Sequence, residues 1–251
     1  MNPIGVMTFN VRQCRGRDGR IDPERILRVI DQSAPDIVAL QEVESSFGSD
    51  HLSYLGNGLR MSVFGPAVPG GNAYLSRFPL KGIQQYSLGN DGICLKADLD
   101  LLGKRVHLFN VRLHPSPFHQ YHQLKNLFGS DLVGNPYFPC SKLILGDFGA
   151  FCPWFWNLPF LSLGRLRRPL WRLTYPSWFP LFSRDRVYHL GDIEVLHATV
   201  VWNPLTRSAS SHLPLNVTVN IRDNLDYLHA EQIRGEMGTA AGCFRKKAAL
   251  R

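Results

Sequence analysis

Five polar side chains, widely separated along the chain, each stand at or beside the end of an expected strand: Asn10, Glu42, Asp147, Asp185 and His212. Carboxylate oxygens hold Mg²⁺ or Mn²⁺ weakly and leave coordination positions for phosphate and water. A second carboxylate can orient or deprotonate an attacking water, and a histidine paired with a carboxylate can stabilise or protonate a phosphoryl group. If the five side chains meet, they predict a site for metal-assisted phosphoester chemistry.

Each of these residues also has a purely structural explanation. Asn10 can cap a turn, Asp185 can form a surface ion pair with the arginines on either side of it, and His212 can be a core histidine with a satisfied ring. Glu42 is the hardest to explain in this way, because it ends an apolar strand of about seven residues.

The elements that must position these side chains are strands that end in polar residues. Residues 143–147 run from branched apolar side chains into Gly146 and a carboxylate, which is typical of a buried strand reaching the rim of a sheet. Residues 4–11 and 36–42 have the same character. They flank a helix that starts at Asp22-Pro23, an N-cap followed by proline at the first helical position. If these two strands are parallel neighbours, Asn10 and Glu42 lie on the same rim.

The rest of the chain supplies two clusters of strands with helices between them. Further strands are expected over residues 59–68, 71–76, 93–101, 106–113, 187–188, 193–202 and 215–221, and a helix over 118–132. This arrangement predicts an α/β layered sandwich. We expect residues 1–222 to form one domain and residues 223–251 to be a C-terminal extension, either a short helix or a loose tail.

The charge and cysteine content of the chain limit the kinds of partner and compartment to expect. The 251 residues carry a formal net charge of +8, which favours nucleic acid, phospholipid head groups or small phosphates, although a basic surface can also serve solubility alone. The five cysteines are widely spaced without a CxxC pair, which argues against a disulfide framework or a thiolate zinc site and fits a reducing, cytoplasmic compartment. We find no signal peptide and no transmembrane segment, and we expect a monomer.

Residues 151–182 hold all but one of the five tryptophans, together with several arginines, phenylalanines and prolines. The simplest interpretation is a loop packed by its own aromatic side chains. The alternative is a surface that lies on a membrane interface or stacks on bases.

Six motifs, in order along the chain, resemble those of the endonuclease/exonuclease/phosphatase superfamily, the sandwich phosphoesterases related to DNase I. They are Thr8–Val11, Pro35–Glu42, Gly71–Leu80, Leu145–Phe148, Arg184–Val187 and Ala209–Pro214. Each motif alone is weak, but together they are specific and span nearly the whole chain. The resemblance implies a DNase I-like four-layer αββα sandwich with one active site at the top of both sheets.

The resemblance also implies roles. Glu42 is expected as metal ligand with Asn10 beside it, Asp147 as the group aimed at the nucleophilic water, and Asp185 with His212 as a pair against the phosphate. The expected phosphate-binding residues are Arg112, His114 and Arg77, although Arg77 can equally serve the fold by tying a loop carbonyl.

Three positions depart from the family pattern. Gly149 stands where the family usually has asparagine, Ser211 where it has aspartate, and Arg112 where it often has histidine. His114, two residues on, faces the same side of the strand and can take that histidine's place. Loss of one preorganised donor commonly costs about 10²–10³ in rate.

Two functions therefore remain. The first is a phosphodiesterase that uses Mg²⁺ or Mn²⁺, with nucleic acid, phospholipid and small phosphates all open as substrates. The second is a catalytically degenerate relative that binds nucleic acid or an anionic phospholipid surface, in a salt-sensitive way and without turnover. If the departures impair catalysis, Gly149→Asn combined with Ser211→Asp should raise activity.

Overall fold

The fold is known from a computed structural model, which describes residues 3–46, 49–65, 70–101, 103–138, 140–149 and 172–221. The expected C-terminal extension and residues 151–171 of the aromatic segment lie outside these ranges. No helix of the described residues has the length and apolar character needed to cross a lipid bilayer.

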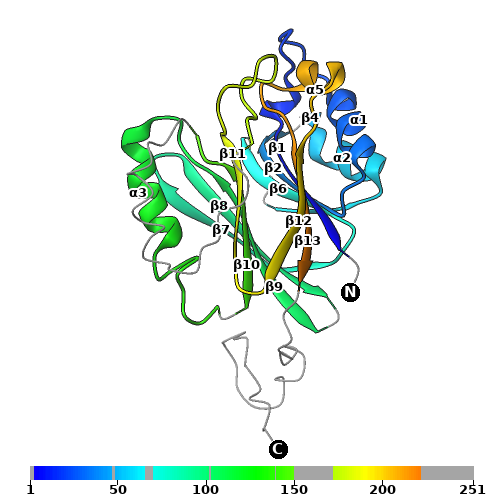
Figure 1. Cartoon of the computed structure of the whole chain (residues 1–251). Coiled ribbons are helices and arrows are strands. Elements are labelled where there is room, and N and C mark those ends of the chain that lie inside the picture. The colour runs from blue at the N-terminus through cyan, green and yellow to red at the C-terminus, as the bar shows by residue number, and fades with distance from the viewer. Residues whose placement is uncertain are drawn as a thin grey trace, which may run out of the picture.

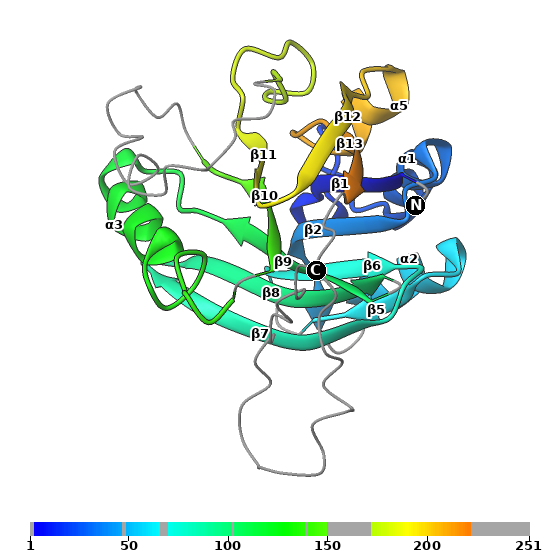
Figure 2. The same cartoon turned by 60° about the horizontal axis from the view of Figure 1, so that its bottom comes forward.

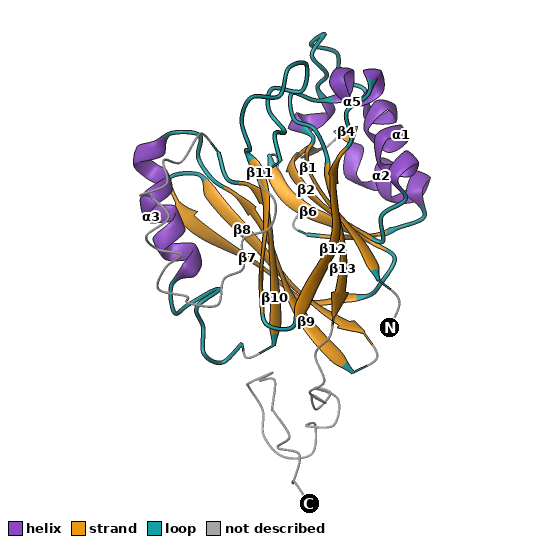
Figure 3. Cartoon of the chain, in the orientation of Figure 1, coloured by secondary structure: helices purple, strands orange, loops and turns teal. Residues whose placement is uncertain are grey.

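Two mixed sheets pack face to face (Figure 1, Figure 3). The six-stranded sheet has the order β12-β13-β1-β2-β6-β5, and the five-stranded sheet has the order β11-β10-β9-β8-β7. The bounds of the first are β12 (Ile193–Val200), β13 (Leu215–Ile221), β1 (Ile4–Asn10), β2 (Ile37–Val43), β6 (Gly71–Ser76) and β5 (Ser62–Phe64). Those of the second are β11 (Asp185–Leu190), β10 (Ser141–Asp147), β9 (Lys104–Arg112), β8 (Gly92–Leu101) and β7 (Leu80–Gly89). The short strands β3 (Ser45–Ser46) and β4 (Ser49–Asp50) pair separately.

Helices cover the outer face of each sheet, which completes the expected αββα sandwich (Figure 2). The helices α1 (Pro23–Ser33), α2 (His51–Leu59) and α5 (Pro204–Ala209) cover the six-stranded sheet, and α3 (Pro117–Phe128) covers the five-stranded one. A single-turn helix, η1 (Arg12–Cys14), follows β1.

Three groups of buried apolar side chains fill the spaces between the four layers. In β2, Ile37 and Ala39 join the group between the sheets, whereas Val38 and Leu40 join the group under the helices. This alternation is the period of two of a strand buried on both faces. Full burial of one such side chain stabilises the fold by roughly 1.5–3 kcal/mol.

Most expected elements are present. Of the strand expected over residues 59–68, the described part forms β5, and residue 59 instead ends α2. The strands β3, β4 and β7 and the helices α2 and α5 were not expected. Cys140 is disulfide-bonded, which departs from the expected reducing compartment, whereas Cys14 and Cys94 are free and buried.

Strand registers bring the polar strand ends together. The parallel pairing of β1 with β2 sets Asn10 beside Gln41, next to Glu42. In the other sheet, Asp147 of β10 pairs with Arg112 of β9 and with Asp185 of β11. Both sheets therefore present their polar residues at the same end of the sandwich.

Candidate active site

A cleft of about 370 Å³ opens where the ends of the two sheets meet. Its lining includes polar side chains from both sheets and from the loops that follow them: Asn10, Arg12, Glu42, Asp91, Arg112, His114, Asp147, Tyr175, Arg184, Ser211 and His212. Four of the five residues singled out at strand ends line this cleft, and the fifth, Asp185, lies directly behind His212.

Glu42 enters the cleft through an irregularity in β2. The pairing of β2 with β6 shifts register between Leu40 and Val43, and Glu42 has a φ of +52°. A left-handed backbone at a non-glycine residue is strained and persists only where surrounding structure enforces it. Bulges of this kind re-aim side chains beside active sites. The bend turns the Glu42 carboxylate into the cleft.

Asn10 joins the two sheets at the base of the cleft. Its Nδ2 donates to Glu42 Oε1 at 2.9 Å and to Asp147 Oδ2 at 3.0 Å, and its Oδ1 accepts the backbone N–H of Arg12 at 3.0 Å. Both ends of the amide are thus engaged and its orientation is fixed. In this structure Asn10 links the carboxylates of Glu42 and Asp147.

Asp147 is buried at the centre of the site. Its Oδ1 accepts the backbone N–H of Gly149 at 2.8 Å, and its Oδ2 accepts from Arg184 Nη2 at 3.1 Å as well as from Asn10. His212 Nε2 stands 3.7 Å from the same oxygen. Because charge-assisted hydrogen bonds are about twice as strong as neutral ones, this ring of donors holds the carboxylate in one position.

His212 is held from behind by Asp185. The Asp185 Oδ2 lies 2.9 Å from His212 Nδ1, and both side chains are buried. Burial disfavours the charged imidazolium, but the carboxylates of Asp185 and Asp147 outweigh it and raise the pKa of His212 above its ordinary value. The ring also packs on Tyr175, at 5.0 Å between centroids. The geometry presents His212 Nε2 towards the cleft.

The three expected phosphate-binding residues have different positions. Arg112 and His114 line the cleft. His114 Nδ1 accepts the backbone N–H of Ser116 at 2.9 Å, which fixes the ring and leaves Nε2 for a ligand. Arg77 is not brought here, because its backbone N–H donates to Asp36 O at the opposite end of β2. Its position agrees with the alternative, a structural role.

Gly149 is surrounded by side chain and backbone rather than by open space. It has a φ of +74°, and a Cβ atom there would stand 2.2 Å from Gln120 Nε2 and 2.9 Å from His114 O. The buried Gln120 amide, which donates to His114 O at 2.9 Å, occupies the space that a larger side chain would need. Gly149→Asn therefore requires Gln120 and the His114 carbonyl to shift, which opposes the expected rescue.

The strand-end pattern missed four polar cleft residues: Arg12, Asp91, Tyr175 and Arg184. The sequence suggested that Arg184 pairs with its neighbour Asp185, but it pairs with Asp147 and lies over the Tyr175 ring, 4.6 Å from its centroid. Arg184 immediately precedes β11, and the antiparallel register of β10 with β11 brings it to Asp147. That register cannot be read from the sequence.

The acidic side chains suit a loosely held divalent ion better than a closed cage. Within the described ranges, no three His, Cys, Asp or Glu side chains form a group that could hold a metal ion. Mg²⁺, however, is commonly bound by one or two carboxylates together with water and substrate phosphate oxygens. Glu42 lines the cleft and has a left-handed backbone conformation. Its carboxylate fits that kind of site.

Comparisons with known proteins agree with this architecture. The sequence model of the endonuclease/exonuclease/phosphatase family matches residues 7–212. Among solved structures, an endonuclease/exonuclease/phosphatase from Beutenbergia cavernae is similar with a TM-score of 0.70 at 20% identity, over 91% of this chain and 75% of that one. A mannosyl-6-phosphatase from Bacteroides thetaiotaomicron is similar with a TM-score of 0.70 at 16% identity, over 86% of this chain and 99% of that one.

A third similar structure is D. rerio TDP2 complexed with a single-strand DNA product, with a TM-score of 0.68 at 13% identity, over 88% of this chain and 100% of that one. The search of curated proteins returned no match. At these identities the structural likeness concerns the fold alone.

Proposed function

The chain belongs to the endonuclease/exonuclease/phosphatase family, and from this premise we propose that it is a metal-dependent phosphoesterase in which water attacks phosphorus. The observation that carries the proposal is the Asn10 bridge. One amide nitrogen holds Glu42 of one sheet and Asp147 of the other, at 2.9 and 3.0 Å. A strained Glu42 backbone and a buried carboxylate linked in this way have no evident use in stabilising the sandwich.

The roles follow from the positions around the cleft. Arg112, His114 and Arg184 are placed to bind non-bridging phosphate oxygens. Asp147, held by its ring of donors, orients the attacking water and accepts its proton. His212, whose pKa Asp185 raises, donates a hydrogen bond to the phosphoryl group as negative charge develops. A Mg²⁺ or Mn²⁺ ion at Glu42 would offset charge on a phosphoryl oxygen.

The test uses Glu42, whose two substitutions separate charge from geometry. Glu42→Gln keeps an oxygen that can accept from Asn10 but removes the charge, and Glu42→Ala removes both. We expect both to lower Mg²⁺- or Mn²⁺-dependent hydrolysis of bis(p-nitrophenyl) phosphate by about 10²–10³. Asp131→Asn, at an exposed acidic residue beyond α3, is the matched control and should keep full activity. Full activity in Glu42→Gln, or in protein treated with EDTA, would contradict the proposal.

A second function, binding of a polyanion without hydrolysis, is favoured because the protein's own side chains already contact the groups that a substrate would need. Both oxygens of Asp147 already accept hydrogen bonds, and Gln120 fills the space beside Gly149. If these contacts persist when a phosphate enters, the protein binds a polyanion without turnover. Salt-sensitive binding together with metal-independent background hydrolysis in the wild type would favour this binding protein.

A further inference from the structure

We propose that the loop of residues 172–183, together with Trp202, forms a face that docks onto an anionic phospholipid bilayer. This face adjoins the cleft through Tyr175, and its proposed role goes beyond the phosphoesterase chemistry. It does not depend on that chemistry, because docking and turnover can be measured separately.

The first observation is a concentration of exposed apolar side chains. Five large apolar side chains fall within the ten positions 173–182: Leu173, Trp178, Phe179, Leu181 and Phe182. These five and Trp202 are 41% to 58% exposed. No other stretch of ten described residues holds as many large exposed apolar side chains. Contiguous apolar surface of this kind marks an interaction site.

The second observation is that hydrogen bonds hold the backbone of the loop in place. Its backbone closes on itself through Phe182 N–H to Tyr175 O at 2.8 Å and Thr174 N–H to Phe182 O at 2.9 Å. It is also tied to the body of the protein, through Ser177 N–H to Ser211 O at 2.8 Å. These hydrogen bonds fix the loop backbone, and the apolar side chains that it carries remain exposed.

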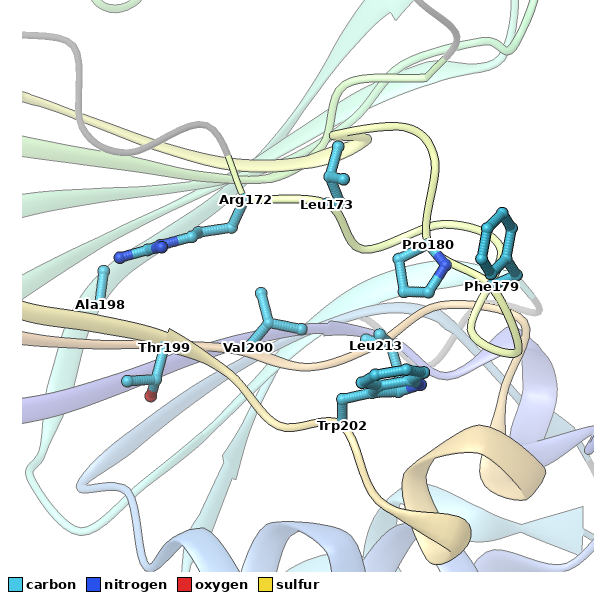
Figure 4. Close-up of a pocket in the computed structure, with 9 residues that line it drawn as sticks. All are labelled: Arg172, Leu173, Phe179, Pro180, Ala198, Thr199, Val200, Trp202 and Leu213. Atoms are coloured by element: carbon cyan, nitrogen blue, oxygen red, sulfur yellow. The ribbon is translucent and has the colours of Figure 1, made fainter.

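The third observation is a hollow of about 640 Å³ between this loop and β12 (Figure 4). At one end of it lie Phe179, Pro180 and Trp202, and at the other the Arg172 side chain extends over Ala198 and Thr199. No carboxylate stands among its lining residues. An apolar body with a cation at one end matches an acyl chain joined to a phosphate head group.

Arginines accompany the exposed tryptophans. The Arg17 guanidinium lies 5.8 Å from the centre of the Trp178 ring, and Arg207 lies 5.8 Å from that of Trp202. Asp18, which lines an adjoining hollow with both arginines, is paired with Arg25 at 2.8 Å. The positive charge of this face is therefore not cancelled by Asp18, and it suits an anionic surface.

The side chains favour a bilayer over single-stranded nucleic acid. Bases stack on aromatic rings, whereas Leu173, Pro180 and Leu181 have no aromatic ring on which a base could stack. Tryptophan, phenylalanine and leucine with flanking arginine are the composition of interfacial membrane anchors. The loop also contributes Tyr175 to the cleft, so a docked bilayer would lie beside the mouth of the active site.

The test is co-sedimentation of the full chain with sucrose-loaded vesicles of phosphatidylcholine, with and without phosphatidylserine. We expect binding to the anionic vesicles and weak binding to the zwitterionic ones. Phe179→Ala with Trp202→Ala should lower the partition coefficient at least about tenfold, from the lost apolar contact. Arg172→Gln and Arg207→Gln should each lower it roughly fivefold on anionic vesicles.

The control is Phe118→Ala with Tyr137→Ala, which removes two aromatic side chains that are 82% and 80% exposed on and beyond α3. It should bind vesicles as the wild type does. The proposal is overturned if the wild type does not sediment with anionic vesicles at low salt, or if the loop variants bind as well as the wild type. Binding of oligo-dT that is lost in the loop variants, without vesicle binding, would also overturn it in favour of nucleic acid.

Discussion

At the level of single residues, the site depends on how His212 is charged. Asp185→Asn keeps an oxygen that can accept from His212 Nδ1 but removes the carboxylate that contributes most to raising its pKa. Burial then dominates and the pKa falls. If charged His212 is needed for turnover, activity is lost as pH rises through its pKa. The alkaline limb of the kcat/KM profile should therefore move to lower pH in this variant.

The same shift has a consequence for stability. A histidine whose pKa is raised in the folded state stabilises the fold below its unfolded pKa, and this contribution is lost as pH rises through the folded pKa. In urea unfolding at several pH values, the Asp185→Asn variant should lose most stability, relative to the wild type, on the acidic side. An unchanged alkaline limb together with an equal loss at every pH would mean that Asp185 only packs.

Substitutions at Gly149 and Gln120 should have non-additive effects on the free energy of unfolding. Gly149→Asn alone should destabilise the protein by about 1–3 kcal/mol, because the new Cβ meets Gln120 Nε2 and His114 O. Gln120→Ala removes one of these two contacts. A double-mutant cycle by urea unfolding should therefore show favourable coupling, with Gln120→Ala costing less in the Gly149→Asn background than in the wild type. Strict additivity would show that the two positions do not share this space.

At the level of elements, the apolar strands and the helix α1 could be predicted, whereas β7, α2 and α5 could not. The helix α1 carries its own start signal: the Asp22 side chain accepts the Arg25 N–H at 3.3 Å, and Pro23 is its first residue. The edge strand β7 has few buried residues and so lacks the apolar alternation that marks a strand. The helix α2 contains two glycines, which are poor helix formers.

Those two glycines, Gly56 and Gly58, give a matched pair. A Cβ at Gly56 would stand 2.5 Å from Val63 Cγ2 and 3.1 Å from the backbone Met61 O, whereas one at Gly58 would meet only the flexible end of Leu27. Alanine gains roughly 1 kcal/mol of helix propensity at either site. By urea unfolding we expect Gly56→Ala to be destabilising and Gly58→Ala to be close to neutral. If both stabilise, propensity and not packing governs α2.

The candidate site could be predicted in its acidic half and less well in its basic half. Asn10, Glu42 and Asp147 lie at the ends of strands that the sequence marks clearly. Parallel pairing brings Asn10 and Glu42 to one rim, and the packing of the two sheets brings Asp147 to them. Arg184 and Tyr175 reach the cleft through the register of β11 and a loop closed by long-range hydrogen bonds. Such contacts depend on tertiary structure, and no spacing in the sequence encodes them.

At the level of the whole molecule, the sandwich gathers opposite charges at one end. Glu42, Asp91 and Asp147 share the cleft with Arg12, Arg112 and Arg184, while the chain as a whole carries +8. The local charges position a bound phosphate, whereas the net charge acts over longer distances and raises the rate at which anions arrive. The two effects should respond differently to salt.

Raising ionic strength from about 0.01 to 1 M shortens the screening length from roughly 30 to 3 Å. The long-range attraction is then lost, but buried pairs such as Arg184 with Asp147 are little screened. With a soluble phosphodiester substrate we therefore expect KM to rise and kcat to change little. A parallel fall in kcat would mean that salt disrupts the site itself, and a flat KM would mean that the positive charge faces away from the path of the substrate.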